Sequence, residues 1–121
     1  MSTQTGRIPL YLVDDHALFR EGLARLLEAQ PDFEIAGQAD HVTKGLRGIA
    51  ELHPALVLLD VDLGSERALD FVKEAKAQGF DGKILIVTAG VTDLEAMQLI
   101  QAGVAGIFHK HNPPEMLCEA V

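Results

Sequence analysis

Short apolar runs alternate along the chain with longer stretches in which apolar residues recur at the period of a helix. A strand buried on both faces is a short continuous apolar run, whereas a helix that covers a sheet is apolar on one side only. The repeated order of strand and then helix is typical of a parallel sheet with helices on both faces. The expected strands are 10–13, 33–39, 55–60, 83–87 and 106–109, and the expected helices begin near residues 16, 43, 66, 93 and 112.

The run 55–60 is the most apolar of these segments, so we expect it at the centre of the sheet. The sequence as a whole predicts an α/β fold of the flavodoxin-like, doubly wound kind. In this fold five parallel strands lie in the order 2-1-3-4-5, in a three-layer (βα)5 arrangement.

The helices differ in how clearly the sequence marks them. The second helix, 43–52, has Thr43 as its expected N-cap and contains Gly45 and Gly48, each of which costs about 1 kcal/mol relative to alanine. The buried positions expected of the helices are Phe19, Leu23, Leu26 and Leu27 in the first, Leu46, Ile49 and Ala50 in the second, and Met97, Leu99 and Ile100 in the fourth.

A chain of 121 residues, of which 48% are apolar, is long enough for one hydrophobic core and too short for two ordinary domains. We therefore expect a single domain over 1–121, with an ordered core from about residue 8 to 121. The last helix runs into the end of the chain, so we do not expect that end to be the natural terminus.

Charge and composition narrow the classes of function. Acidic residues outnumber basic ones by 18 to 10, and a net charge of −8 has the wrong sign for binding the phosphates of DNA. The sequence has neither a signal peptide nor an apolar run of the roughly 18 residues that a membrane helix needs. Cys118 is the one cysteine and cannot form a disulfide within the chain. We expect a cytoplasmic protein that binds neither membrane nor, by itself, DNA.

Polar residues stand where the predicted strands end. Asp14 and Asp15 follow the first strand, Asp60 ends the third, Thr88 follows the fourth and Lys110 follows the fifth. The carboxyl ends of parallel strands meet at one edge of the sheet, and ligands of such folds bind there, between the first and third strands when the order is 2-1-3-4-5. The three aspartates are therefore expected to meet.

Three carboxylates held close together repel one another unless a hard cation lies among them. Mg²⁺, or Mn²⁺ in its place, fits such a site, because it binds one or two carboxylates together with a phosphoryl oxygen. A carboxylate can attack phosphorus to form an acyl phosphate. Asp60 needs no base for this reaction, since it is ionised at neutral pH. The pattern indicates phosphoryl transfer.

The runs 13–23, 58–60 and 87–89, together with Lys110, closely resemble the receiver domains of two-component response regulators. The resemblance covers essentially the whole chain. The stretch 14–23 is most similar to regulators that carry a LuxR-type helix-turn-helix output domain, and no such domain lies within these residues.

The resemblance implies a role for each residue at the sheet edge. The donor would be a phosphohistidine on a sensor histidine kinase, and the domain would assist its own phosphorylation and dephosphorylation without acting on a separate substrate. It also implies a possible homodimer through the last helices, and DNA binding only through an output domain. The implied roles are phosphoacceptor for Asp60, direct metal ligand for Asp15, metal ligand through water for Asp14, metal ligand through its backbone carbonyl for Asp62, and phosphoryl binding for Thr88 and Lys110.

The sequence departs from this family in the loop after Asp60 and at the switch position, and it also has His111 where many receivers have a proline after the lysine. The loop 61–68 lacks the proline and the later glycine that many relatives have. Ile107 occupies the position of the usual aromatic switch residue, and strand alternation points the neighbouring Phe108 to the other face of the sheet.

Other interpretations remain open. A receiver-like interaction module that works without phosphorylation would fit the altered loop and Ile107. Asp60 and Asp62 also resemble the nucleophile motif of haloacid-dehalogenase-type phosphohydrolases, although that motif would follow a first strand. The histidines are scattered, so we do not expect them to form a transition-metal site; they are His16, His41, His53, His109 and His111.

Overall fold

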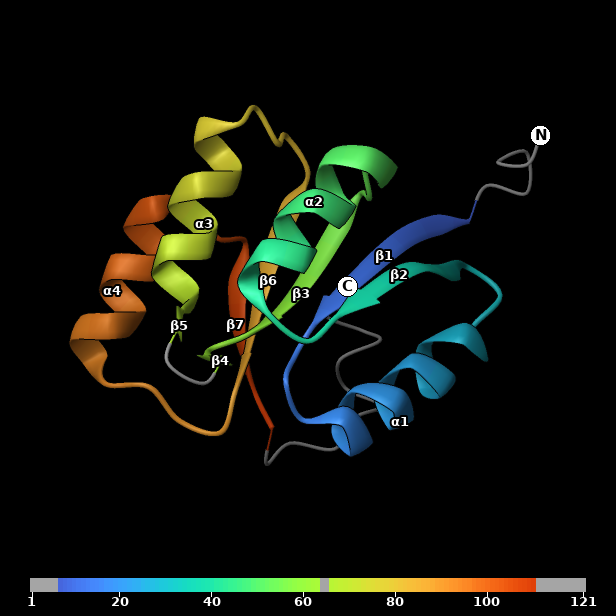
Figure 1. The fold of residues 1–121 in the computed structure, drawn as a ribbon. Helices are drawn as coiled ribbons and strands as arrows, with labels where there is room; N and C mark the ends of the chain where they lie inside the picture. The colour runs from blue at the N-terminus through green and yellow to red at the C-terminus, as the bar shows by residue number, and fades with distance from the viewer. Residues whose placement is uncertain (1–6, 64–65, 111–121) are drawn as a thin grey trace.

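The computed structural model describes residues 7–63 and 66–110. Within these residues, a sheet of five parallel strands has one helix on one face and three on the other (Figure 1). The strand order is β2-β1-β3-β6-β7, which is the predicted order 2-1-3-4-5 once the two short strands β4 and β5 are set aside. The strands of the sheet are β1 (Ile8–Val13), β2 (Phe33–Ala39), β3 (Leu56–Asp60), β6 (Lys83–Thr88) and β7 (Gly106–His109).

The central strand is β3, which pairs with β1 on one side and β6 on the other. Every one of its residues is buried, as the apolar run predicted. Four helices cover the sheet in the described part of the chain: α1 (Ala17–Glu28), α2 (Val42–Leu52), α3 (Ala68–Ala77) and α4 (Asp93–Ala102). The predicted last helix, from residue 112, lies outside the described residues.

Two hydrophobic cores lie on opposite faces of the sheet because successive side chains of a strand point in opposite directions. One core lies under α2, α3 and α4 and includes Val57, Leu59 and Phe71. The other lies under α1 and includes Leu58 and Leu27. The neighbours in β7 divide in the same way: Ile107 packs against the first core and Phe108 against the second, as alternation predicted.

The start of α2 differs from the prediction. Its N-cap is His41 and not Thr43, and His41 makes no capping hydrogen bond with its side chain. Ala50 was expected in the core but is exposed, whereas Gly45 is buried. The reason is close packing: a side chain at Gly45 would contact Val13 and Phe71. The helix therefore turns its glycines toward the sheet.

The start of α3 lies two residues later than predicted. Residues Glu66–Arg67 (β5) pair antiparallel with Asp62–Leu63 (β4), so their backbone groups bond across a two-stranded ribbon and α3 begins at Ala68. The segment after Asp60 is therefore a short hairpin next to the carboxyl edge of the sheet.

Helix α4 corrects a second expectation about burial. Leu99 is 2% exposed, but Met97 is 55% and Ile100 59% exposed. Apolar residues occur on all sides of this helix, so the sequence pattern does not reveal which side faces the protein.

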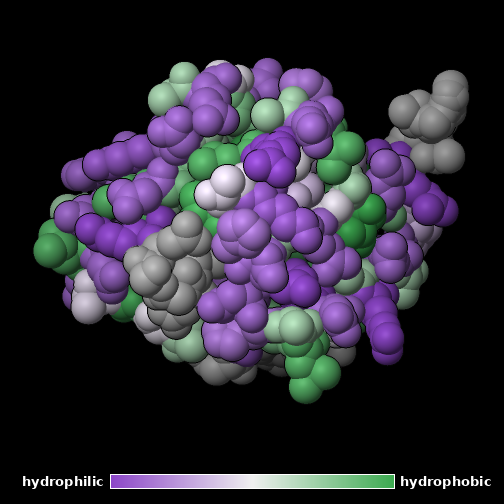
Figure 2. Space-filling view, in the orientation of Figure 1, coloured by the Kyte–Doolittle hydropathy of each residue, from purple (hydrophilic) through white to green (hydrophobic). Residues whose placement is uncertain are grey.

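The surface is mixed in character. The face in Figure 2 is mainly hydrophilic, with hydrophobic side chains visible between the hydrophilic ones. Within the described residues, none of the helices is long and apolar enough to cross a membrane.

Candidate functional site

Carboxylates, an ammonium group and an imidazole converge at the carboxyl edge of the sheet. Ligand atoms of Asp14, Asp15, His16 and Asp60 all lie within 4.8 Å of one another. Lys110 Nζ lies 3.4 Å from Asp14 Oδ2 and 3.3 Å from Asp60 Oδ1. The three aspartates and the lysine thus meet where the parallel sheet required them to meet.

Backbone hydrogen bonds just beyond the strands hold these residues in place. The N–H of Asp14 donates to the carbonyl of Ala39 (3.0 Å), and the N–H of Lys110 donates to the carbonyl of Thr88 (2.7 Å). The N–H of Val61, directly after Asp60, donates to a carbonyl of β6 (3.2 Å). The backbone at Asp14, Asp60 and Lys110 is therefore attached to a neighbouring strand, which fixes where these side chains start.

The Asp60 side chain is 1% exposed, and the Asp14 side chain is 7% exposed. Burying a carboxylate costs several kcal/mol unless an opposite charge accompanies it. Lys110 supplies that charge to both residues, and its ammonium also lies over the ring of Phe19, 4.4 Å from the centroid. Asp15 is more open, with 35% of its side chain exposed. The cluster has a buried floor and an accessible rim.

Thr88 ends β6 and is completely buried. Its Oγ1 accepts a hydrogen bond from the N–H of Gly90 (2.9 Å). This bond uses an oxygen lone pair and not the hydroxyl proton, so the hydroxyl keeps its capacity to donate. Ile107, the predicted switch position, lies in the core beneath α3 and α4 and not in the cluster.

His16 is a member of the cluster that the sequence interpretation missed. Its Nδ1 lies 3.1 Å from Asp14 Oδ1, 3.4 Å from Asp15 Oδ1 and 3.2 Å from Asp60 Oδ2. The charge of Lys110 and partial burial lower the pKa of His16, but the hydrogen bond to Asp14 and the charges of Asp14 and Asp15 outweigh them, so the pKa lies above its ordinary value. The available signal was its position directly after Asp15.

Arg20 is a second residue that the sequence interpretation missed. Its Nη1 donates to the backbone carbonyl of Asp14 (2.6 Å), and its Nε donates to Gln38 Oε1 (3.1 Å). Bonds from a charged guanidinium are stronger than neutral ones. Arg20 therefore ties the turn that carries Asp14 to both α1 and β2.

The donor set is suited to a divalent cation. Carboxylate oxygens from three aspartates within one small volume match the oxygen ligands that Mg²⁺ prefers. Asp62 lies in β4, but its side chain is not among those the structure describes, and the predicted role of its carbonyl stays a prediction.

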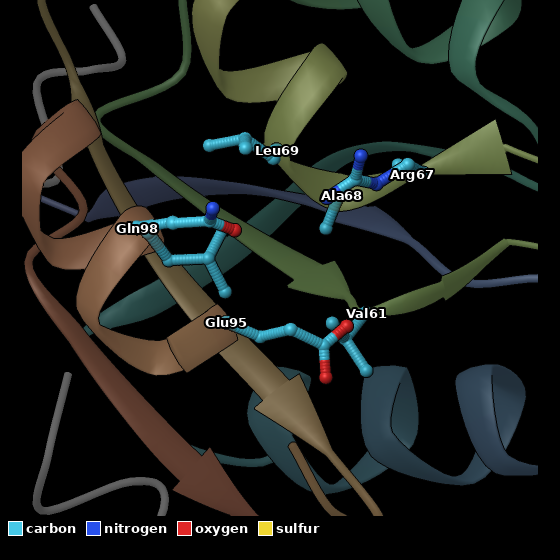
Figure 3. Close-up of a pocket in the computed structure, with 7 residues that line it drawn as sticks. Val61, Arg67, Ala68, Leu69, Glu95 and Gln98 are labelled. Carbon is cyan, nitrogen blue, oxygen red and sulfur yellow. The ribbon is translucent and has the colours of Figure 1, made fainter. Parts of the chain in front are cut away.

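A separate hollow lies between the start of α3 and α4 (Figure 3). Arg67, Ala68 and Leu69 form one side of it, Glu95 and Gln98 of α4 form the other, and Val61 and Leu99 complete the lining. It is lined by one basic side chain, Arg67, and one acidic side chain, Glu95, and its polar groups do not converge on one point as those at the carboxyl edge do.

Comparison with known proteins agrees with this geometry. The family described as "Response regulator receiver domain" matches residues 10–121. The chain is 30% identical over 115 residues to the nitrate/nitrite response regulator protein homolog of Haemophilus influenzae, covering 95% of this chain and 55% of that protein. It is 32% identical over 114 residues to the transcriptional regulatory protein LiaR of Bacillus subtilis, covering 94% of this chain and 54% of that protein. The chain thus spans about half the length of these relatives.

Solved structures show the same fold. A LuxR-family two-component response regulator from Aurantimonas sp. SI85-9A1 superposes with a TM-score of 0.88 at 27% identity, covering 94% of this chain and 81% of that one. A LuxR-family DNA-binding response regulator from Staphylococcus aureus superposes with a TM-score of 0.86 at 23% identity, covering 93% of each chain.

Proposed function

The chain belongs to the family of response regulator receiver domains, and from this we propose that it accepts a phosphoryl group on Asp60 with a divalent cation bound beside it. The observation that carries the proposal is the burial of the Asp60 carboxylate, 1% exposed, against Lys110 and close to Asp14. Carboxylates held close together in a buried site repel one another and so disfavour folding, and such clusters are typical of functional sites.

The reaction is an in-line attack of an Asp60 carboxylate oxygen on phosphorus. A new O–P bond forms while the P–N bond of a phosphohistidine breaks, and the electron pair of that bond stays on the imidazole of the donor. Negative charge on the phosphoryl oxygens then needs positive partners. Lys110, already 3.3 Å from Asp60, supplies an ammonium, and Thr88 supplies a hydroxyl donor.

The cation, Mg²⁺ or Mn²⁺, would neutralise charge on the phosphoryl oxygens when bound. Asp15 and Asp60 would hold it directly, Asp14 would do so through water, and the backbone carbonyl of Asp62 would complete the set. Asp15 suits direct binding because it is the most exposed of the three clustered aspartates.

The partners follow from the family. A sensor histidine kinase would be the phosphoryl donor, and the domain would assist its own phosphorylation and dephosphorylation. The relatives named above are about twice as long as this chain, which supports an attached DNA-binding output domain controlled by the receiver. We further propose a cytoplasmic location and a homodimer formed through the last helices.

The test is phosphoryl uptake from acetyl phosphate in the presence of Mg²⁺, followed by intact-protein mass spectrometry. We expect the parent to gain one phosphoryl group and Asp60→Asn to gain none, because an amide is not a nucleophile for phosphorus. Asp40→Asn is the matched control, since Asp40 is an exposed aspartate outside the cluster. Equal labelling of Asp60→Asn and the parent would show that another residue is the acceptor.

A second candidate is a receiver-like interaction module that works without phosphorylation. It is favoured by Ile107 at the switch position and by the loop after Asp60, which lacks the proline and the later glycine that many relatives have. A parent that takes up no phosphoryl group while binding its partner would support this candidate. The hydrolase interpretation has less support, because Asp60 ends the third strand of the sheet, and it would require multiple turnover of a phosphate ester.

A further inference from the structure

We propose that His16 is a ligand of the metal site and gives that site a preference for transition-metal ions such as Co²⁺, Ni²⁺ and Zn²⁺ over Mg²⁺. The inference rests on the metal site of the proposed function and adds to it a nitrogen ligand. It revises the expectation that the histidines of this chain form no transition-metal site.

The geometry of one nitrogen atom is the basis of the proposal. His16 Nδ1 lies between 3.1 and 3.4 Å from an oxygen of each of Asp14, Asp15 and Asp60. These spacings are close to those of neighbouring ligand atoms around one small cation. A metal ion among the three oxygens would therefore have Nδ1 within reach.

Helix capping does not explain where the imidazole lies. His16 is the N-cap residue of α1, yet its side chain makes no capping hydrogen bond. Its backbone N–H donates to Asp14 Oδ1 (2.8 Å), a bond that any residue with an N–H can make. The ring points instead into the cluster, although 56% of the side chain is exposed and could lie in solvent.

The negative charge of the carboxylates around His16 Nδ1 also favours the binding of a cation there. Lys110 Nζ lies 3.5 Å from His16 Nδ1. Three carboxylates face this one ammonium. A divalent ion would therefore compete with Lys110 for the same oxygens and would leave the ammonium available for a phosphoryl group.

Ligand chemistry turns this geometry into selectivity. Mg²⁺ prefers oxygen ligands and retains several waters, so an imidazole nitrogen adds little to its affinity for the site. Imidazole suits Zn²⁺, Ni²⁺ and Co²⁺, whose affinity for sites containing nitrogen exceeds that of the harder ions. Removing His16 should consequently weaken the binding of transition metals and leave the binding of Mg²⁺ nearly unchanged.

The test compares dissociation constants for Co²⁺ and Mg²⁺ in the parent, in His16→Asn and in His41→Asn. His41 is the matched control, because it too is a helix N-cap without a capping bond and its Nδ1 contacts one aspartate, Asp40, at 2.7 Å. We expect His16→Asn to lose about tenfold or more in Co²⁺ affinity, since removal of even an outer partner of a metal ligand costs 10- to 100-fold. Its Mg²⁺ affinity should stay within about twofold of the parent, because the oxygen ligands remain, and His41→Asn should match the parent for both ions.

A second measurement reads coordination directly. On addition of Zn²⁺, the ¹⁵N resonance of His16 Nδ1 should move to the position of a metal-bound ring nitrogen, and that of His41 should not. Unchanged Co²⁺ affinity in His16→Asn, or an equal loss for Co²⁺ and Mg²⁺, would overturn the role of His16 and leave the Mg²⁺ site standing. A parent that binds neither ion would overturn the metal site of the proposed function as well.

Discussion

Lys110 contacts both buried carboxylates of the site, Asp14 and Asp60, and so holds together a cluster that a divalent cation would also hold. A cation that binds only the folded cluster adds stability by mass action, about 2.7 kcal/mol at a hundredfold excess over its dissociation constant. The effect of Mg²⁺ on the melting temperature therefore measures the site without any phosphoryl donor.

We expect millimolar Mg²⁺ to raise the melting temperature of the parent, and we expect Asp15→Ala to remove most of this increase. In the absence of Mg²⁺, Asp15→Ala should melt no lower than the parent, because it relieves repulsion among the carboxylates. Thermal unfolding with and without Mg²⁺ measures both effects. Asp81→Ala, an exposed aspartate before β6, is the control. If Mg²⁺ does not change the melting temperature of the parent, the result counts against the metal site.

Tyr11 allows a pH prediction because it is the one tyrosine in the chain. Burial, followed by the charge of Glu51, raises the pKa of its phenol above the ordinary 10.0. The native state therefore keeps a proton that the unfolded chain loses, so this contribution to stability is complete below pH 10.0 and is lost as the pH rises through the native pKa.

We accordingly expect the phenolate absorbance of the folded protein to rise at a higher pH than that of the protein unfolded in urea. Tyr11→Phe should remove the absorbance change, and it should flatten the fall in stability above pH 10.0. If the folded and unfolded proteins titrate together, Tyr11 is not buried as described.

At the scale of elements, the glycines of α2 show how packing reverses a helix propensity. A Cβ at Gly48 would overlap the hydroxyl and ring of Tyr11 in the strand below. Gly22, inside α1, has nothing within 4 Å of such a Cβ. The two positions therefore separate helix propensity from packing.

Gly22→Ala should raise the free energy of unfolding by about 0.5–1 kcal/mol, because alanine restricts the unfolded chain and favours the helix. Gly48→Ala should lower it by about 1–3 kcal/mol, the usual cost of overpacking a core. Urea denaturation of both variants provides the comparison. If Gly22→Ala and Gly48→Ala stabilise the protein equally, Tyr11 does not exclude a side chain at position 48.

At the scale of the whole molecule, the response to phosphorylation depends on how the site is coupled to distant surfaces. Thr88 and Lys110 can both move toward a phosphoryl group, since charge-assisted contacts do not require an aromatic residue at position 107. Ile107 packs into the core beneath α3 and α4 and has no large ring that could alternate between two positions. A ligand shifts a population only as far as its affinities for the two states differ.

We expect beryllofluoride, which mimics the phosphoryl group, to cause small graded shifts in the NMR resonances of α4 and β7 in the parent. Ile107→Tyr should give larger shifts with two discrete states. Phe108→Tyr is the control, because Phe108 packs on the opposite face of the sheet. A discrete two-state change in the parent, unaltered by the tyrosine at 107, would show that another residue acts as the switch.

The sequence alone determined the five strands of the parallel sheet, their order and the meeting of Asp14, Asp15, Asp60 and Lys110. Strand burial depends on a local apolar pattern, and the carboxyl ends of parallel strands must share one edge, so both could be inferred without coordinates. The family resemblance then gave each residue a role to test.

The tertiary structure alone decided which neighbours each side chain meets. His16 turns into the cluster, Arg20 reaches the carbonyl of Asp14, and Gly48 makes room for Tyr11. Met97 and Ile100 lie on the exposed side of α4, which the sequence could not reveal because apolar residues occur on all sides of that helix. These outcomes depend on distances between elements that are far apart in the sequence. A pattern along the chain records the period of each element and not its rotation against its neighbours.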